Sequence, residues 1–139
     1  MDVNTVCTAL ADQVRAGVPS LNCFGHIPDS TPVPCFFTGE YDIEYDKATD
    51  HGMDEAAITC YVLVSRTDIR SAQESLSRFA AGSGPLSIKA AIETDRTLGG
   101  AVEDIRVIDF RTLGAEELDL DDRIGGVFTV RALAQSETE

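Results

Sequence analysis

The sequence is poor in several residue types that enzymes and nucleic-acid-binding proteins depend on. It has no tryptophan and two histidines, and its 11 lysine and arginine residues face 24 aspartate and glutamate residues, for a net charge of −13. A chain this acidic repels nucleic acid and anionic membranes as a whole. The composition therefore argues against sequence-specific DNA binding.

Long apolar runs and a basic leader are also missing. No stretch approaches the ~20 apolar residues that a helix needs to cross a bilayer. The first residues, MDVNTVCTALADQV, carry an acid at position 2 and no basic segment, so we expect no secretory signal. The sequence thus predicts a protein made in a cytoplasm, with no membrane partner.

Paired cysteines are absent as well. The four cysteines form no CxxC pair, and neither histidine lies at ligand spacing from any of them. A structural zinc site needs several ligands at short, paired spacings. We therefore predict free thiols, no metal and no other cofactor. The residues concerned are Cys7, Cys23, Cys35, Cys60, His26 and His51.

No catalytic motif stands out. Gly-x-Ser-x-Gly and the phosphate-binding glycine loops do not occur. Gly82-Ser83-Gly84 precedes a predicted helix but no lysine follows it directly, and the acids at 119–122 lack the glycine and glutamate of a calcium loop. The sequence accordingly predicts no catalytic residues and a protein that is not an enzyme.

The hydrophobic periodicity predicts one α+β domain over residues 1–135, followed by a polar tail at 136–139. Helical spacing predicts a helix from Val3 to Ala16 and another after Asp68. Strand patterns cover 20–24, 33–46, 56–65, 103–111 and 127–134, and a short helix is expected from Pro85. The order α-β-β-β-α-α-β-β favours a small antiparallel sheet with helices packed on one face.

The predicted strand VPCFFTGEYDIEYD, residues 33–46, has an unusual alternation. Acids occupy every second position from Glu40 to Asp46, and Tyr41, Ile43 and Tyr45 point the other way. Two interpretations remain open: a solvated edge protected against aggregation, or a functional interface or channel lining. The candidate acidic residues, here and in the acidic loop of 114–126, are Glu40, Asp42, Glu44, Asp46, Glu116, Glu117, Asp119, Asp121 and Asp122.

Residues 83–107, SGPLSIKAAIETDRTLGGAVEDIRV, combine a helix start, a short amphipathic helix and a glycine turn before a strand. Leu86, Ile88, Ala91 and Ile92 form the apolar stripe, and Lys89 and Glu93 are expected to face away from it. An ordinary helix-turn-strand unit of any α+β domain has the same pattern. The run therefore carries no chemistry of its own.

In order and spacing, this run resembles the tail terminator proteins of long-tailed (siphovirus) phages of actinobacteria. The resemblance extends to the N-terminal helix, the loop with Pro28 and Pro32, the acidic strand, and the Ser65-Arg66-Thr67-Asp68 segment before the second helix. The four cysteines and the acidic segment 114–126 match no pattern of that family. The loop 114–126 therefore receives no role from the resemblance.

The resemblance implies a structural virion protein of the tail and neck region, made in the host cytoplasm. Such proteins form a homo-oligomer, a hexameric ring, on the head-proximal end of the tail tube. The ring stops polymerisation of the tail tube protein and docks to the neck or head-closure connector protein, while DNA passes through without specific binding. In that setting, the acidic residues are candidates for the channel lining or the interface.

Two alternatives stay open on the sequence. The first is another neck or head-completion protein, or the tail tube protein itself. The second belongs to a different class, a small cytosolic enzyme or ligand-binding α+β domain, which predicts a concave pocket with converging polar groups.

Overall fold

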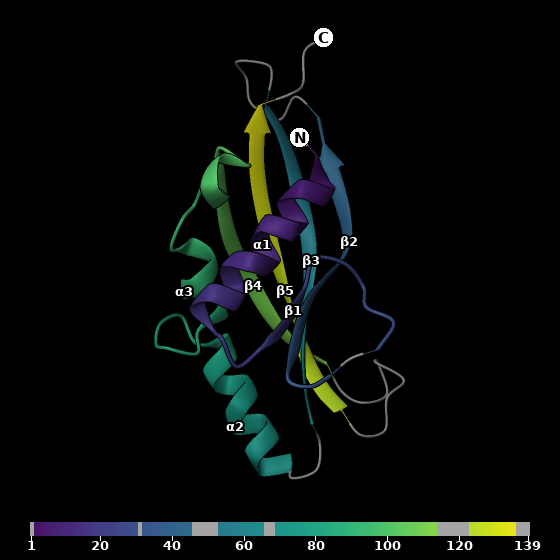
Figure 1. The fold of residues 1–139 in the computed structure, drawn as a ribbon, viewed down its shortest axis with the longest axis vertical. Helices are drawn as coiled ribbons and strands as arrows, with labels where there is room; N and C mark the ends of the chain where they lie inside the picture. The colour runs from purple at the N-terminus through teal and green to yellow at the C-terminus, as the bar shows by residue number, and fades with distance from the viewer. Residues whose placement is uncertain (1, 31, 46–52, 66–68, 114–122, 136–139) are drawn as a thin grey trace.

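A computed structural model describes residues 2–30, 32–45, 53–65, 69–113 and 123–135 of the chain. They form one sheet and a set of helices (Figure 1). The elements follow in the order α1 (Val3–Gly17), β1 (Asn22–Phe24), β2 (Cys35–Glu44), β3 (Met53–Ser65), α2 (Ile69–Ala80), α3 (Ile88–Glu93), the 3-10 turn η1 (Leu98–Gly100), β4 (Asp104–Leu113) and β5 (Arg123–Gln135).

The five strands lie in the spatial order β1-β2-β3-β5-β4. The four long strands pair antiparallel, whereas the short β1 pairs parallel with the first residues of β2. The predicted α+β class and element order are confirmed, and β1 makes the sheet a mixed one. β3 is central, as its apolar sequence indicated, although it is fully buried on one face and half-buried on the other.

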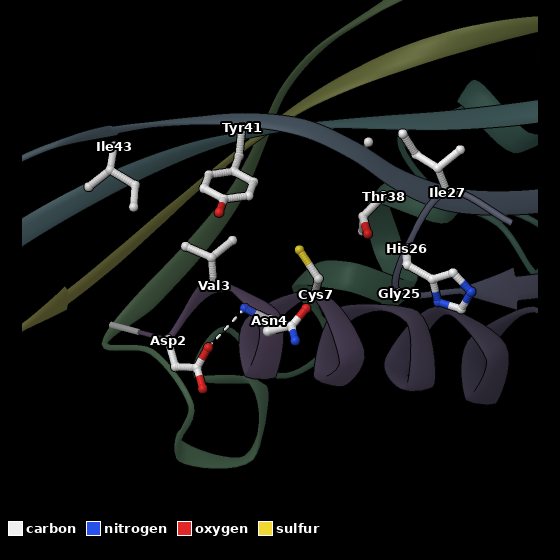
Figure 2. A pocket seen from close by; sticks show the side chains of 11 residues that line it. Asp2, Val3, Asn4, Cys7, Gly25, His26, Ile27, Thr38, Tyr41 and Ile43 are labelled. Carbon is white, nitrogen blue, oxygen red and sulfur yellow. Dashed lines mark hydrogen bonds between the residues drawn. The ribbon is translucent and has the colours of Figure 1, made fainter.

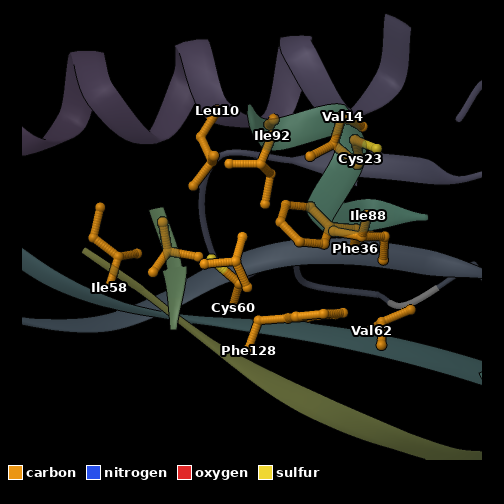
Figure 3. Close-up of a cluster of buried hydrophobic side chains, with 14 of the residues drawn as sticks. Leu10, Val14, Cys23, Phe36, Ile58, Cys60, Val62, Ile88, Ile92 and Phe128 are labelled. Carbon is orange, nitrogen blue, oxygen red and sulfur yellow. The ribbon is translucent and has the colours of Figure 1, made fainter. Parts of the chain in front are cut away.

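The helices all pack on the same face of the sheet. Figure 1 shows α1 lying across the strands, with α2 and α3 beside it. Figure 3 shows Leu10 and Val14 of α1 above the strand residues Ile58 and Phe128, with Ile92 of α3 reaching into the same core. Each of these five side chains is at most 1% exposed. This layer is the main hydrophobic core.

Local capping explains where α1 begins and how it holds α3. The Asp2 carboxylate accepts a hydrogen bond from the Asn4 backbone N–H at 3.1 Å, as an N-cap does. The Gln13 side chain donates to the backbone carbonyls of Ala91, Ile92 and Asp95 at the end of α3. Carbonyls that a helix end leaves without intrahelical partners are thereby satisfied.

The start of α3 differs from the prediction. The helix begins at Ile88 and not at Pro85, because Ser87 is the N-cap: its hydroxyl accepts a hydrogen bond from the Ala90 N–H at 3.0 Å. Pro85 and Leu86 lie instead in a turn in which the Ser87 N–H donates to the Gly84 carbonyl. Gly84 has a φ of 111°, a conformation that glycine adopts without steric cost.

Two further expectations in this region need correction. α3 ends at Glu93, before the glycine pair, and Leu98–Gly100 forms a separate 3-10 turn. Glu93 does not face away, because its Oε2 accepts a hydrogen bond from the Val107 backbone N–H at 3.0 Å. The predicted apolar stripe is otherwise right, with Ile88, Ala91 and Ile92 buried.

The second helix places the predicted Ala72, Leu76 and Phe79 in the core, while Ala80 is half-buried. The proposed N-cap Asp68 lies outside the described residues. So does the whole predicted polar tail at 136–139.

Candidate functional site

The acidic row of β2 lies on the face of the sheet opposite the helices. Glu40, Asp42 and Glu44 are exposed, and Asp42 and Glu44 pair with Ala57 and Glu55 of β3. Tyr41 and Ile43 point to the other face, toward α1 (Figure 2). The alternation predicted for this strand is therefore present from Glu40 to Glu44.

A β-bulge decides which face receives the acids. The pairing of β2 with β3 shifts between Thr38 and Tyr41, so two residues, Gly39 and Glu40, face one residue of β3. Thr38 and Tyr41 consequently both face α1 (Figure 2). Without the bulge, Tyr41 would share the face of Phe37, and the acids would lie against the helix.

Glu40 is held by a neighbour on the same face. The Tyr61 hydroxyl donates a hydrogen bond to Glu40 Oε1 at 2.5 Å, which lowers the pKa of Glu40. Burial and the same contact raise the pKa of Tyr61 to about 12. The Tyr61 ring also stacks on Phe37, with ring centroids 5.1 Å apart.

The other predicted acidic residues lie outside the described residues. They are Asp46, Glu116, Glu117, Asp119, Asp121 and Asp122. Of the nine candidates, the structure thus brings Glu40, Asp42 and Glu44 together in one row.

Arginines on the far side of the same face were not anticipated. Arg106 and Arg111 of β4 pair with Arg131 and Val127 of β5, which share the helix-free face with the acids. Arg131 Nε lies 3.2 Å from Glu55 Oε1. The charged side chains of this face are therefore all acids along β2, whereas β4 carries Arg106 and Arg111 together with Asp104 and Asp109.

A second bulge aligns these arginines, and this is why the sequence pattern hid them. Arg106 and Arg111 are an odd number of residues apart, so plain alternation puts them on opposite faces. The pairing shifts between Val107 and Asp109, which inserts one extra residue and returns Arg111 to the face of Arg106. Strand periodicity without that insertion could not have grouped them.

The helix-free face also carries apolar side chains, most of them buried or half-buried. Cys35, Phe37 and Leu63 form a small buried cluster there, with Phe24, Val33 and Tyr61 packed around it. Further along β5 and β3, Val127 and Leu133 are half-buried. In the part of the chain that the structure describes, no helix covers this face (Figure 1).

The main described pocket, of about 460 Å³, is an open groove between α1 and β2 (Figure 2). Its lining combines the apolar or aromatic residues Val3, Cys7, Ile27, Tyr41 and Ile43 with the polar residues Asp2, Asn4, His26 and Thr38. Its carboxylate, Asp2, is occupied as the cap of α1, where it also accepts from the Thr5 hydroxyl at 3.0 Å. His26 stands at the rim (Figure 2), and its ring makes an edge-to-face contact with Phe24, with ring centroids 6.0 Å apart.

The thiols are placed for packing. All four cysteines are buried and free, and burial raises the pKa of Cys23 and Cys35 to about 11. Complete burial also raises the pKa of Cys60 well above its ordinary value. A reactive cysteine needs a lowered pKa and access to solvent. These thiols have neither property.

Within the described ranges, no group of three or more histidine, cysteine, aspartate or glutamate residues is placed to hold a metal ion. None of the helices described is long and apolar enough to span a membrane.

Comparison with other proteins adds no family. The chain matches no protein-family model and no curated protein.

Proposed function

We propose that this protein is a tail terminator: a structural subunit that forms a ring on the head-proximal end of a phage tail tube. The sequence resemblance suggests this role, and one structural observation carries it. The helices cover one face of the sheet, and the other face, which no described helix covers, has exposed charged side chains around a small buried apolar cluster. Such a face suits contact with other subunits better than chemistry.

The groove beside α1 supports the same choice. A general base or nucleophile needs a partner within hydrogen-bond reach and a pKa suited to its task. Among the groove residues, Asp2 serves as a helix cap and burial raises the pKa of Cys7. Enzymatic activity therefore finds no support in this groove.

Electron microscopy of the purified protein mixed with tail tube protein tests the proposal. We expect tubes of limited length that carry a ring at one end, and free rings whose number increases with salt. Salt screens the charges of a −13 chain beyond a Debye length of about 8 Å at physiological ionic strength. Long stacks of this protein alone would identify a tube protein instead. A monomer at every salt concentration, with tubes present, would exclude both.

A further inference from the structure

The two edges of the sheet are each half covered. The uncovered half of β2 is acidic, whereas the uncovered half of β4 carries one arginine and one aspartate. On one side, β1 pairs with Cys35–Phe37 of β2, and no other described strand pairs with β2 on that side. The remaining stretch, Gly39–Glu44, contains the acidic row together with the half-exposed Tyr41. An uncovered strand edge is a template for another strand.

On the opposite edge, α3 and the turn after it cover the first half of β4. Glu93 Oε2 accepts the hydrogen bond of the Val107 N–H, a group at the outer edge of the sheet. Arg96 Nε lies 2.8 Å from Asp104 Oδ1. The second half of β4, from Asp109 to Leu113, pairs with β5 on its inner side and has no described strand on its outer side. Asp109, Arg111 and Thr112 are exposed.

We infer that the ring closes by strand addition, in which Gly39–Glu44 of β2 pairs antiparallel with Asp109–Leu113 of β4 from a second copy of this chain. The inference rests on the proposed ring and names its subunit contact. Because neighbouring long strands are antiparallel throughout, β2 and β4 run in opposite directions. When a neighbouring subunit has the same orientation, its β4 is therefore antiparallel to β2, and the antiparallel pattern of the sheet continues across the contact.

Charge sets the register of this contact. Asp42 and Arg111 both lie on the helix-free face, at the centres of the two uncovered stretches. When they stand opposite each other, Arg111 also has Glu40 and Glu44 as diagonal neighbours. Opposite charges across strands stabilise a pair, and like charges destabilise it. The same register sets Asp109 against Glu44, so this one contact is repulsive.

The register implies a stagger between neighbours. Within one chain, the strand pairings place Arg111 level with Phe37. Phe37 pairs with Tyr61 and Asp42 pairs with Ala57, so moving Arg111 level with Asp42 displaces the neighbour by four residues of β3, or ~13 Å at ~3.3 Å per residue.

A stagger of this size agrees with a closed barrel. Four long strands are about 19 Å wide at ~4.7 Å spacing, and a stagger of ~13 Å over that width tilts the strands by about 35°. Closed barrels have tilts of about 35–45°. The helix-free face, with its acidic row, then continues from subunit to subunit around the ring.

Cysteine cross-linking of the full chain tests the register. In the double variant Asp42→Cys with Arg111→Cys, we expect mild oxidation to give a ladder of linked subunits up to the ring size, since disulfides need Cβ atoms about 4 Å apart. The matched control is Asp42→Cys with Arg106→Cys, because a neighbour without stagger would set Asp42 level with Arg106. This control should stay unlinked.

Charge variants give a readout that does not depend on cysteine. Asp42→Arg should shift ring formation to at least tenfold higher protein concentration, and adding Arg111→Asp should restore it. Asp109→Asn should lower the required concentration. Suppose that rings form normally, but that cross-links appear only in the Asp42→Cys/Arg106→Cys control or in neither cysteine variant. That result would overturn the strand-addition inference and leave the terminator proposal standing. If the unmodified chain forms no ring, both fail.

Discussion

The Tyr61 hydroxyl donates a 2.5 Å hydrogen bond to Glu40 Oε1 and so joins the central strand of the sheet to the acidic row at its edge. The contact lies directly at the bulge of β2, where Glu40 is one of two residues facing a single residue of β3. It orients the first acid of the row on the helix-free face. The ionisation of Tyr61 can be measured in the isolated protein, without any partner protein.

Tyr61 should remain protonated to unusually high pH in the folded protein. Its pKa is about 12, against 10.0 for an ordinary tyrosine. Between these values the unfolded chain binds fewer protons than the folded chain, so the free energy of unfolding should fall as pH rises from about 10 to 12. Denaturant unfolding at several pH values should show this loss. Tyr61→Phe should show less of it, and an equal loss in the variant would contradict the assignment.

The buried stripe of α2 should dominate the stability of that helix. Leu76 is 5% exposed, and Leu76→Ala should lower the free energy of unfolding by about 2–5 kcal/mol, through lost burial and the cavity left behind. Ser77→Ala, on the exposed side of the same turn, is the control. It should change the free energy of unfolding by less than ~0.5 kcal/mol. Thermal or denaturant unfolding measures both. Equal melting temperatures for the two variants would show that α2 does not pack as described.

The four cysteines should titrate as thiols only after unfolding. A thiol reagent at pH 8 reacts with the thiolate, and burial raises the pKa of Cys23 and Cys35 to about 11. We expect four reactive thiols in the denatured, unreduced protein and very slow reaction in the native one. Finding only two reactive thiols, or none, in the denatured protein would reveal disulfides. Zinc in elemental analysis would also contradict the prediction.

The acidic row should matter for DNA passage. Each basic group that contacts DNA releases counterions and adds affinity, so a conducting channel should avoid such groups. If the helix-free face lines the channel, Glu40→Lys with Glu44→Lys should slow DNA ejection from the particles that still assemble, whereas the matched glutamine pair should slow it less. Fewer lysine-bearing particles should assemble, because both positions flank Arg111 of the neighbour in the inferred contact. Both side chains are exposed, so the isolated variants should stay folded. Ejection at the normal rate from lysine-bearing particles would place this face away from the channel.

Much of the architecture was readable from local sequence. Apolar spacing located α1 and α2, and β-rich segments located the strands, because a helix or strand must turn one consistent face toward the core. The alternation of 40–44 correctly separated the acids from Tyr41 and Ile43. Cysteine spacing likewise predicted thiols that the fold buries.

Tertiary structure decided what local pattern could not. Ser87 replaced Pro85 at the start of α3 because its hydroxyl reaches both the Ala90 N–H and the Ala81 carbonyl across a turn. The bulges in β2 and β4 shift side chains by one position, and such a shift moves every following residue to the other face. Strand order then separated the acids of β2 from Arg106 and Arg111 by the width of the sheet. Pairing between distant segments fixes these features, and no local window of sequence contains both partners.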